Sequence, residues 1–134
     1  MSAVFIDASF WVGYRDDEEL RHEEAYRIME RFLRERAQFV TTWQVFCEIH
    51  ANFSRNSKKR ELILLDFWQN PLILVEQTST LDQKNAVEIL RANRDKAYSL
   101  CDGLSFAIMR RLGIRRAASF DRHFKQFGEF EIIS

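Results

Sequence analysis

The chain has 134 residues, equal numbers of acidic and basic side chains, and 46% hydrophobic residues with only 4 Gly and 1 Pro. A chain of this size can bury a core without disulfides or structural metal, so we expect a single globular domain spanning residues 1–134. The apolar runs Leu62–Leu65 and Leu72–Val75 are far shorter than the ~20 residues of a membrane-spanning helix, and Asp7 interrupts any signal-peptide core. We therefore expect a cytoplasmic protein with no membrane segment.

The first half of the chain alternates short apolar runs with segments of helical periodicity. The pattern predicts strands at about 3–6 and 38–41, and helices at about 8–14, 19–36 and 43–54. The helix at 19–36 places apolar side chains from Leu20 to Leu33 on one face, and Thr42 is the expected N-cap of the helix that follows.

The second half continues the alternation. The helix at about 58–69 should end near Asn70, because Pro71 disfavours helical geometry in the residue before it. The remaining predicted elements are strands at 72–76, 116–119 and 131–133, and helices at 80–93, 99–112 and just after Asp121. Thr80–Gln83 has the spacing of a capping box, and Gly113 is a suitable helix stop. Alternating strands and helices predict a mostly parallel sheet covered by helices.

Three acidic residues are expected at one edge of this sheet. Asp7 and Asp121 follow strands, and Asp102 opens a helix whose N-terminus faces the same edge. Like charges gathered at one place destabilise a fold unless a cation compensates them. Carboxylate oxygens are hard ligands, so the sequence predicts a site for Mg²⁺ or Mn²⁺.

Each acid also has a structural explanation. Asp7 and Asp121 precede short helices and would serve as N-caps, while Asp102 has the capping-box spacing to Ser99. Glu48 lies beside the apolar stripe of its predicted helix, where a solvated surface Glu is common. These roles account for the acids one at a time but not for their convergence.

Covalent catalysis finds little support in the sequence. The serines Ser9, Ser105 and Ser119 lack a G-x-S-x-G context, and the histidines His22, His50 and His123 show no triad or metal-ligand spacing. Cys47 and Cys101 lie in apolar helical sequence without C-x-x-C spacing, so we expect both to be buried and reduced.

Four motifs in order resemble the PIN domain and, within it, the VapC-type toxin ribonucleases of toxin-antitoxin pairs. The motifs are Phe5–Phe10, Glu48, Ser99–Ala107 and Ala118–Phe124, and the resemblance covers nearly the whole chain. It implies a PIN-like three-layer α/β/α sandwich around a mostly parallel five-stranded sheet.

The resemblance also implies roles for individual residues. Asp7, Glu48, Asp102 and Asp121 would form the catalytic, metal-binding set, with Asp7 and Asp102 as the firmest ligands. Ser119 would be the supporting hydroxyl, at a position where Thr is commoner in the family.

The implied activity is endoribonuclease hydrolysis of RNA phosphodiester bonds with Mg²⁺ or Mn²⁺, by the toxin of a VapBC-type pair. The resemblance also implies a homodimer and a small antitoxin that covers the acidic site and keeps the enzyme inactive. RNA phosphates would meet the basic residues Arg55, Lys58, Arg110, Arg122 and Lys125. Bases could stack on Phe10, Trp11 or Trp43, although core packing is the simpler role for these three.

The alternative is a catalytically inactive PIN-like module that binds RNA or a protein partner. The complete acidic set favours the nuclease, because binding alone does not require four converging carboxylates. A receiver-like or phosphatase-like domain would need an acid pair or a D-x-D motif at Asp7, which the sequence lacks.

Overall fold

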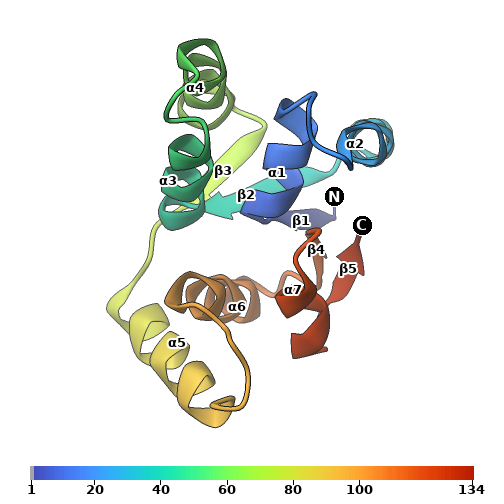
Figure 1. Ribbon diagram of the computed structural model, residues 1–134. Helices are drawn as coiled ribbons and strands as arrows, with labels where there is room; N and C mark the ends of the chain where they lie inside the picture. Colours follow the sequence, from blue (N-terminus) through green and yellow to red (C-terminus); the bar gives the residue numbers. More distant parts are fainter. Residues whose placement is uncertain (1) are drawn as a thin grey trace.

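A computed structural model describes residues 2–134 and contains a five-stranded, entirely parallel sheet (Figure 1). Its strand order is β3-β2-β1-β4-β5. The strands are β1 Ala3–Ile6, β2 Gln38–Thr42, β3 Ile73–Glu76, β4 Arg116–Ala118 and β5 Glu131–Ile133. The predicted five-stranded parallel sheet is confirmed.

Helices cover both faces of the sheet (Figure 1). One layer contains α1 Ala8–Arg15, α2 His22–Glu35, α3 Trp43–Asn52 and α4 Ser57–Leu64, which continues into the π-helical turn η1 Leu65–Gln69. The other layer contains α5 Thr80–Ala92, α6 Leu100–Leu112 and α7 Arg122–Phe127. Right-handed crossovers explain the division, because the chain moves outward from β1 to β3 and then returns to β4 and β5 on the opposite side. The expected three-layer sandwich is confirmed.

The strand order reverses between β1 and β4. The strands that follow β1 in the chain lie on one side of it, whereas β4 and β5 lie on the other. The connections leaving β1 and β4 therefore turn to opposite faces and leave an opening at the carboxyl ends of the two strands.

Short polar motifs start and stop the helices around this opening. The Thr42 hydroxyl caps α3 by accepting the Val45 amide, and Ser99 with Asp102 forms the expected capping box of α6. The capping box of α5 uses Ser79 and Asp82, so the predicted Thr80–Gln83 box was wrong by one residue. Gly113 ends α6 with a φ of 68°, a left-handed conformation in which glycine has no steric penalty.

The core beneath α6 and α7 is largely aromatic. Phe106 on α6 stacks on Phe127 with ring centroids 4.1 Å apart and contacts Phe124 edge-on at 5.0 Å. Tyr98 packs against Phe106 and also against the ring of His123. This packing fixes the start of α7 against the start of α6.

Asp66 joins η1 to α1. Its buried carboxylate accepts hydrogen bonds from the Trp11 indole at 2.9 Å and from Nε and Nη2 of Arg15 at 2.8 and 2.7 Å. Trp11 is therefore a core residue, as is the fully buried Phe10, whereas Trp43 is half exposed.

Two expectations about burial were wrong. Helix α2 begins at His22 rather than at 19, because residues 16–21 form a polar turn, and Leu20 is 96% exposed. Cys47 is exposed, because α3 buries the stripe formed by Val45, Phe46 and Ile49. Cys101 is partly buried, and neither thiol forms a disulfide within the described chain.

An apolar surface lies over α3, α4 and η1. It contains Trp43, Leu64, Leu65 and Trp68, of which Trp68 is 70% exposed and contacts Trp43 edge-on. Among residues 2–134, no helix combines the length and apolar character needed to cross a membrane.

Candidate active site

The four acids expected from the sequence line one cavity. Its volume is about 370 Å³, and it contains Asp7, Glu48, Asp102 and Asp121 together with side chains of α1 and of the turn before α2. Asp7 follows β1 and Asp121 follows the end of β4, so the reversal of strand order places both at this opening. The convergence predicted for Asp7, Asp102 and Asp121 holds, and Glu48 joins them.

Asp7 is buried where the loops after β1 and β4 meet. It occupies the N-cap position of α1, but its side chain makes no capping hydrogen bond. The hydroxyls of Ser9 and Ser119 instead donate to its Oδ2 atom, at 2.7 and 2.8 Å. Its structural role is therefore not that of a side-chain cap.

The same two hydroxyls join the loops to each other. Ser119 Oγ accepts the amide of Asp121 at 3.0 Å, and Ser9 Oγ accepts the amide of Phe120 at 2.9 Å. Each hydroxyl thus donates to Asp7 and accepts from the backbone that carries Asp121. A displacement of either serine would shift two of the four acids.

Asp102 caps α6 and faces the cavity at the same time. Its Oδ2 atom accepts the Ser99 amide at 3.0 Å and lies 3.0 Å from Nδ1 of His123. Its other oxygen, Oδ1, has no hydrogen-bond partner within residues 2–134. The capping explanation is correct but leaves one oxygen for a ligand.

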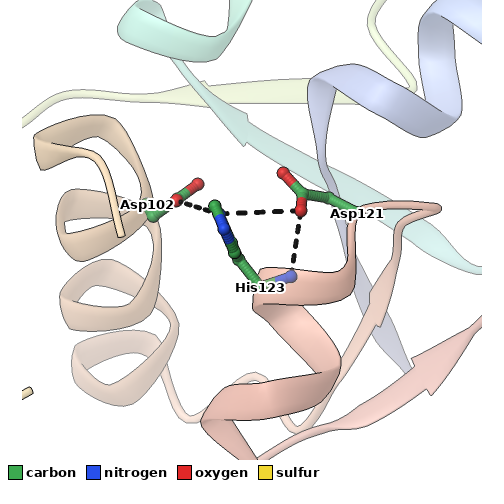
Figure 2. Close-up of side chains that lie close together, drawn as sticks. All are labelled: Asp102, Asp121 and His123. Atoms are coloured by element: carbon green, nitrogen blue, oxygen red, sulfur yellow. Dashed lines mark hydrogen bonds and ion pairs between the residues drawn. The ribbon is translucent and has the colours of Figure 1, made fainter. Parts of the chain in front are cut away.

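Asp121 repeats this arrangement on α7. Its Oδ1 atom accepts the His123 amide at 2.9 Å, as expected of an N-cap, and is 3.7 Å from Nδ1 of His123. Figure 2 shows Asp102 and Asp121 on either side of the His123 ring. Ligand-capable atoms of these three residues lie within 4.8 Å of one another.

Glu48 reaches the cavity from α3. The thiol of Cys101, the residue before Asp102, donates to Glu48 Oε2 at 3.6 Å. Although the residue as a whole is exposed, partial desolvation of its carboxylate raises the pKa of Glu48, and the charges of Asp102 and Asp121 raise it further. Burial raises the pKa of Cys101 to about 12, so the thiol keeps its proton at physiological pH.

Burial raises the pKa of Asp7 to about 6, against the opposing effect of the two serine hydroxyls, and the nearby charge of Asp121 adds to the rise. The raised pKa values of Asp7 and Glu48 reflect the cost of ionising these two carboxylates in the cavity, a cost that a bound cation would offset. Carboxylate oxygens with unpaired positions at Asp102 and Asp121 form a donor set that fits a hard divalent cation.

Comparison with known proteins identifies the family. The family model of the PIN domain matches residues 4–129. The chain belongs to the PIN-domain family.

One relative of this PIN domain matches it over almost the whole chain both in sequence and in structure. The 23S rRNA-specific endonuclease VapC20 of Mycobacterium tuberculosis is 27% identical over 130 residues, covering 96% of this chain and 97% of that protein. The crystal structure of VapC20, a sarcin-ricin-loop-cleaving toxin, has a TM-score of 0.84 at 25% identity, covering 98% and 99% of the two chains.

More distant structures share the fold. FitAcB from Neisseria gonorrhoeae has a TM-score of 0.74 at 12% identity, and a toxin-antitoxin complex from Klebsiella pneumoniae has 0.73 at 10% identity. Each alignment covers 98% of this chain and 96% of the other.

The basic residues expected to bind RNA lie outside the cavity of this PIN domain. Arg110 donates from Nε and Nη2 to the two carboxylate oxygens of Glu129 and borders a separate hollow of about 610 Å³ between α5 and α6. Arg55, Arg122 and Lys125 are exposed and do not line the acidic cavity, nor does Lys58. A role for these residues along a longer RNA strand stays a prediction.

Sequence reasoning gave Ser9 and Arg21 no role at the site, and it favoured a structural role for His123 over a contact with the substrate phosphate. Ser9 holds Asp7, His123 contacts Asp102, and Arg21 lines the cavity. The position of Ser9 two residues after Asp7 was a usable signal, because Ser119 stands two residues before Asp121. His123 and Arg21 come from elements whose mutual placement only the tertiary structure gives.

Asp7→Asn should raise the stability of the metal-free protein at pH 8. An acid whose pKa is higher in the folded state than in the unfolded state loses stability as the pH rises from about 4 through about 6, and Asn mimics the neutral form. In EDTA, the variant should gain between about 1 and 3 kcal/mol in free energy of unfolding by urea denaturation.

At pH 4 that difference should shrink to well under about 1 kcal/mol, because Asp7 is then protonated in the folded state and partly protonated in the unfolded state. The exposed Glu30 provides a matched control, and Glu30→Gln should change stability little at either pH. An Asp7→Asn variant that is less stable than the parent at pH 8 would contradict this account of the buried carboxylate.

Proposed function

We propose that this PIN-domain protein is a divalent-metal-dependent endoribonuclease that hydrolyses RNA phosphodiester bonds as the toxin of a VapBC-type pair. The carrying observation is the convergence of four carboxylates in one cavity at the switch between β1 and β4. The likeness to VapC20 over almost the whole length of both chains supports it. We further propose that residues 1–134 form one such domain and that it works in the cytoplasm.

Asp7 and Asp102 are the proposed principal ligands of Mg²⁺ or Mn²⁺. Asp121 and Glu48 would complete the set, either by binding the ion or by holding a water beside it. When bound, a divalent ion lowers the pKa of a coordinated water and offsets charge that develops on phosphate oxygens. The hydrolysis then needs no protein nucleophile.

Neighbouring side chains orient these carboxylates. Ser119 and Ser9 direct Asp7, and the His123 ring contacts Asp102 on the side away from its unpaired oxygen. The Cys101 thiol holds Glu48, whose raised pKa suits a group that accepts a proton from the attacking water. Preorganisation of this kind reduces the reorganisation required during the reaction.

The proposed substrate class is structured RNA. VapC20 is a sarcin-ricin-loop-cleaving, 23S rRNA-specific enzyme, so a hairpin carrying that ribosomal loop is the first substrate to test. A catalytically inactive module that binds RNA or a protein partner is the second candidate. It shares the fold but would leave the four acids without a chemical role.

Purified protein should cleave the sarcin-ricin hairpin in the presence of Mg²⁺ or Mn²⁺ and lose the activity in EDTA. Asp7→Asn and Asp102→Asn should each lower the cleavage rate by about a hundredfold or more, because even changes to groups around metal ligands cost ~10–100-fold. Gel-resolved cleavage of end-labelled RNA measures the rate.

Glu30→Gln serves again as the control and should cleave at the parental rate. Cleavage that persists undiminished in both Asp variants would identify a contaminating nuclease. A parental protein that binds the hairpin without cutting it would favour the inactive-module alternative.

A small antitoxin is the proposed protein partner. Toxin-antitoxin complexes are among the structures that share this fold. The apolar surface over α3, α4 and η1 is of a kind that partners cover. Co-expression with the short reading frame beside the gene should give a stable complex that does not cleave RNA. If the protein encoded by that reading frame neither co-purifies with this chain nor inhibits its RNA cleavage, the toxin-antitoxin pairing is contradicted.

A homodimer is also proposed, on the family resemblance. Light scattering of the purified protein should give a mass near twice 16.0 kDa. A mass of one chain at all concentrations tested would contradict the dimer and leave the nuclease proposal untouched.

A further inference from the structure

The acidic cavity contains one positively charged side chain among its described lining residues. Asp7, Glu19, Glu48, Asp102 and Asp121 contribute carboxylates, and Arg21 contributes a guanidinium. RNA is a polyanion, so a cavity lined mainly by acids repels the strand that has to enter it. A positively charged side chain in the cavity therefore reduces the repulsion between these acids and the RNA, which a cation elsewhere on the surface would not do.

The ion pair between Arg21 and Glu24 leaves part of the Arg21 guanidinium free to bind a ligand. Nε and Nη2 both donate to a single oxygen of Glu24, at 3.0 and 2.7 Å. Both side chains are more than two-fifths exposed, and exposed pairs of this type contribute little to stability. The N–H groups of Nη1 stay available, and the pair can open without a large cost.

An aromatic ring sets the position of the guanidinium. The Arg21 guanidinium carbon lies 4.2 Å from the centroid of the Phe120 ring. Phe120 lies between Ser119 and Asp121 in the chain, and its backbone N–H donates a hydrogen bond to Ser9 Oγ. A guanidinium that stacks through its face keeps its edge N–H groups free to donate to a phosphate. Arg21 is thereby tied to the loop that carries Asp121.

The Phe120 ring is itself held in place. It packs against Phe10 with centroids 5.6 Å apart, and its other neighbour is Gly13 of α1. A Cβ atom added at Gly13 would lie 3.0 Å from Cε2 of Phe120, closer than real Cβ contacts allow without a shift. The absence of a side chain at position 13 therefore makes room for the ring under Arg21.

The backbone that carries Arg21 is anchored on both sides. Nδ1 of His22 lies 2.8 Å from the carbonyl oxygen of Gly13, and Lys59 on α4 pairs with Asp16 at 2.9 Å. The turn between α1 and α2 is thus fixed to the helices beside the cavity. Arg21 has a defined place there.

We infer that Arg21 binds a phosphate of the RNA next to the bond that is cut, with Phe120 as the platform that positions its guanidinium. The inference rests on the proposed nuclease function and adds a substrate-binding residue to it. Because the contact is to phosphate, it strengthens binding without selecting a base. Because Arg21 covers the exposed face of Phe120, that ring is a support for the cation and not a surface for a base.

The test compares Arg21→Gln and Arg21→Lys with a matched control, Arg27→Gln, at an exposed position on α2, the helix that Arg21 precedes. Arg21→Gln should lower kcat/KM for the sarcin-ricin hairpin about 10- to 100-fold, mainly through KM, as expected for a lost hydrogen bond to a charged group. The kcat/KM of Arg21→Lys should lie between those of the parent and of Arg21→Gln, because lysine keeps the positive charge but lacks the planar guanidinium. Arg27→Gln should match the parent.

Salt dependence separates a phosphate contact from a structural effect. Binding of the labelled hairpin is measured with full-length Asp102→Asn protein, with and without Arg21→Gln, at several salt concentrations. Loss of one phosphate contact should reduce the slope of log K against log salt by about 0.7 to 0.9. Mn²⁺ binding, titrated without RNA on the otherwise parental chain, should not weaken, because Arg21→Gln removes a positive charge from the cavity.

Phe120→Leu tests the platform. It keeps an apolar side chain but removes the ring, so it should raise KM severalfold with kcat little changed. In the Arg21→Gln background, the same change should have no further effect on KM, because both residues act through one contact.

Three results would overturn the role of Arg21. If Arg21→Gln has the parental slope of log K against log salt and a kcat/KM near the parental value, then Arg21 does not contact a phosphate. Loss of Mn²⁺ affinity or of thermal stability in Arg21→Gln would show a structural role. A parental protein that neither binds nor cleaves RNA would overturn the proposed function, and the role of Arg21 with it.

Discussion

The burial of the Asp7 carboxylate at the junction of β1 and β4 is the constraint on which the site depends. A buried charge is costly, and the fold meets that cost with two hydroxyls, one from the first turn of α1 and one from the loop after β4. Ser9 and Ser119 are separated by 110 positions in the chain, yet they donate to the same oxygen. The two segments must therefore approach closely, and that approach carries Asp121 into the cavity.

Asp102 and Asp121 each combine a helix cap with a place in the cavity lining. Each carboxylate uses one oxygen to satisfy backbone amides at a helix start, which these amides need in any case. The partial positive charge at a helix N-terminus favours a negative charge at that point and so offsets part of the repulsion between neighbouring carboxylates. The capping roles of these two acids are confirmed, and the same geometry leaves both carboxylates lining the cavity, which supports the proposed metal-binding role.

Much of the fold follows from local sequence patterns. Alternating apolar runs and helical periodicity gave the strands and helices to within a few residues, and Pro71 and Gly113 marked two helix ends. The convergence of Asp7, Asp102 and Asp121 followed from parallel topology, whereas Glu48 depended on family resemblance. Periodicity failed at Leu20 and Cys47, where a polar turn and the width of the buried stripe decide exposure. Arg21 and His123 were beyond local patterns, because their positions depend on how separate helices pack.

The capping box of α6 has a consequence for how the protein responds to whatever occupies the cavity. One carboxylate both closes the first turn of this helix, through the Ser99 amide, and faces the acidic cavity. A ligand that draws electron density from Asp102 weakens its hold on that amide, so tight binding and a firmly closed first turn oppose each other. The stretch from Asn93 to Ser99, which links α5 to α6, ends on that amide and is thereby joined to a carboxylate of the cavity, although it contributes no side chain to the cavity lining.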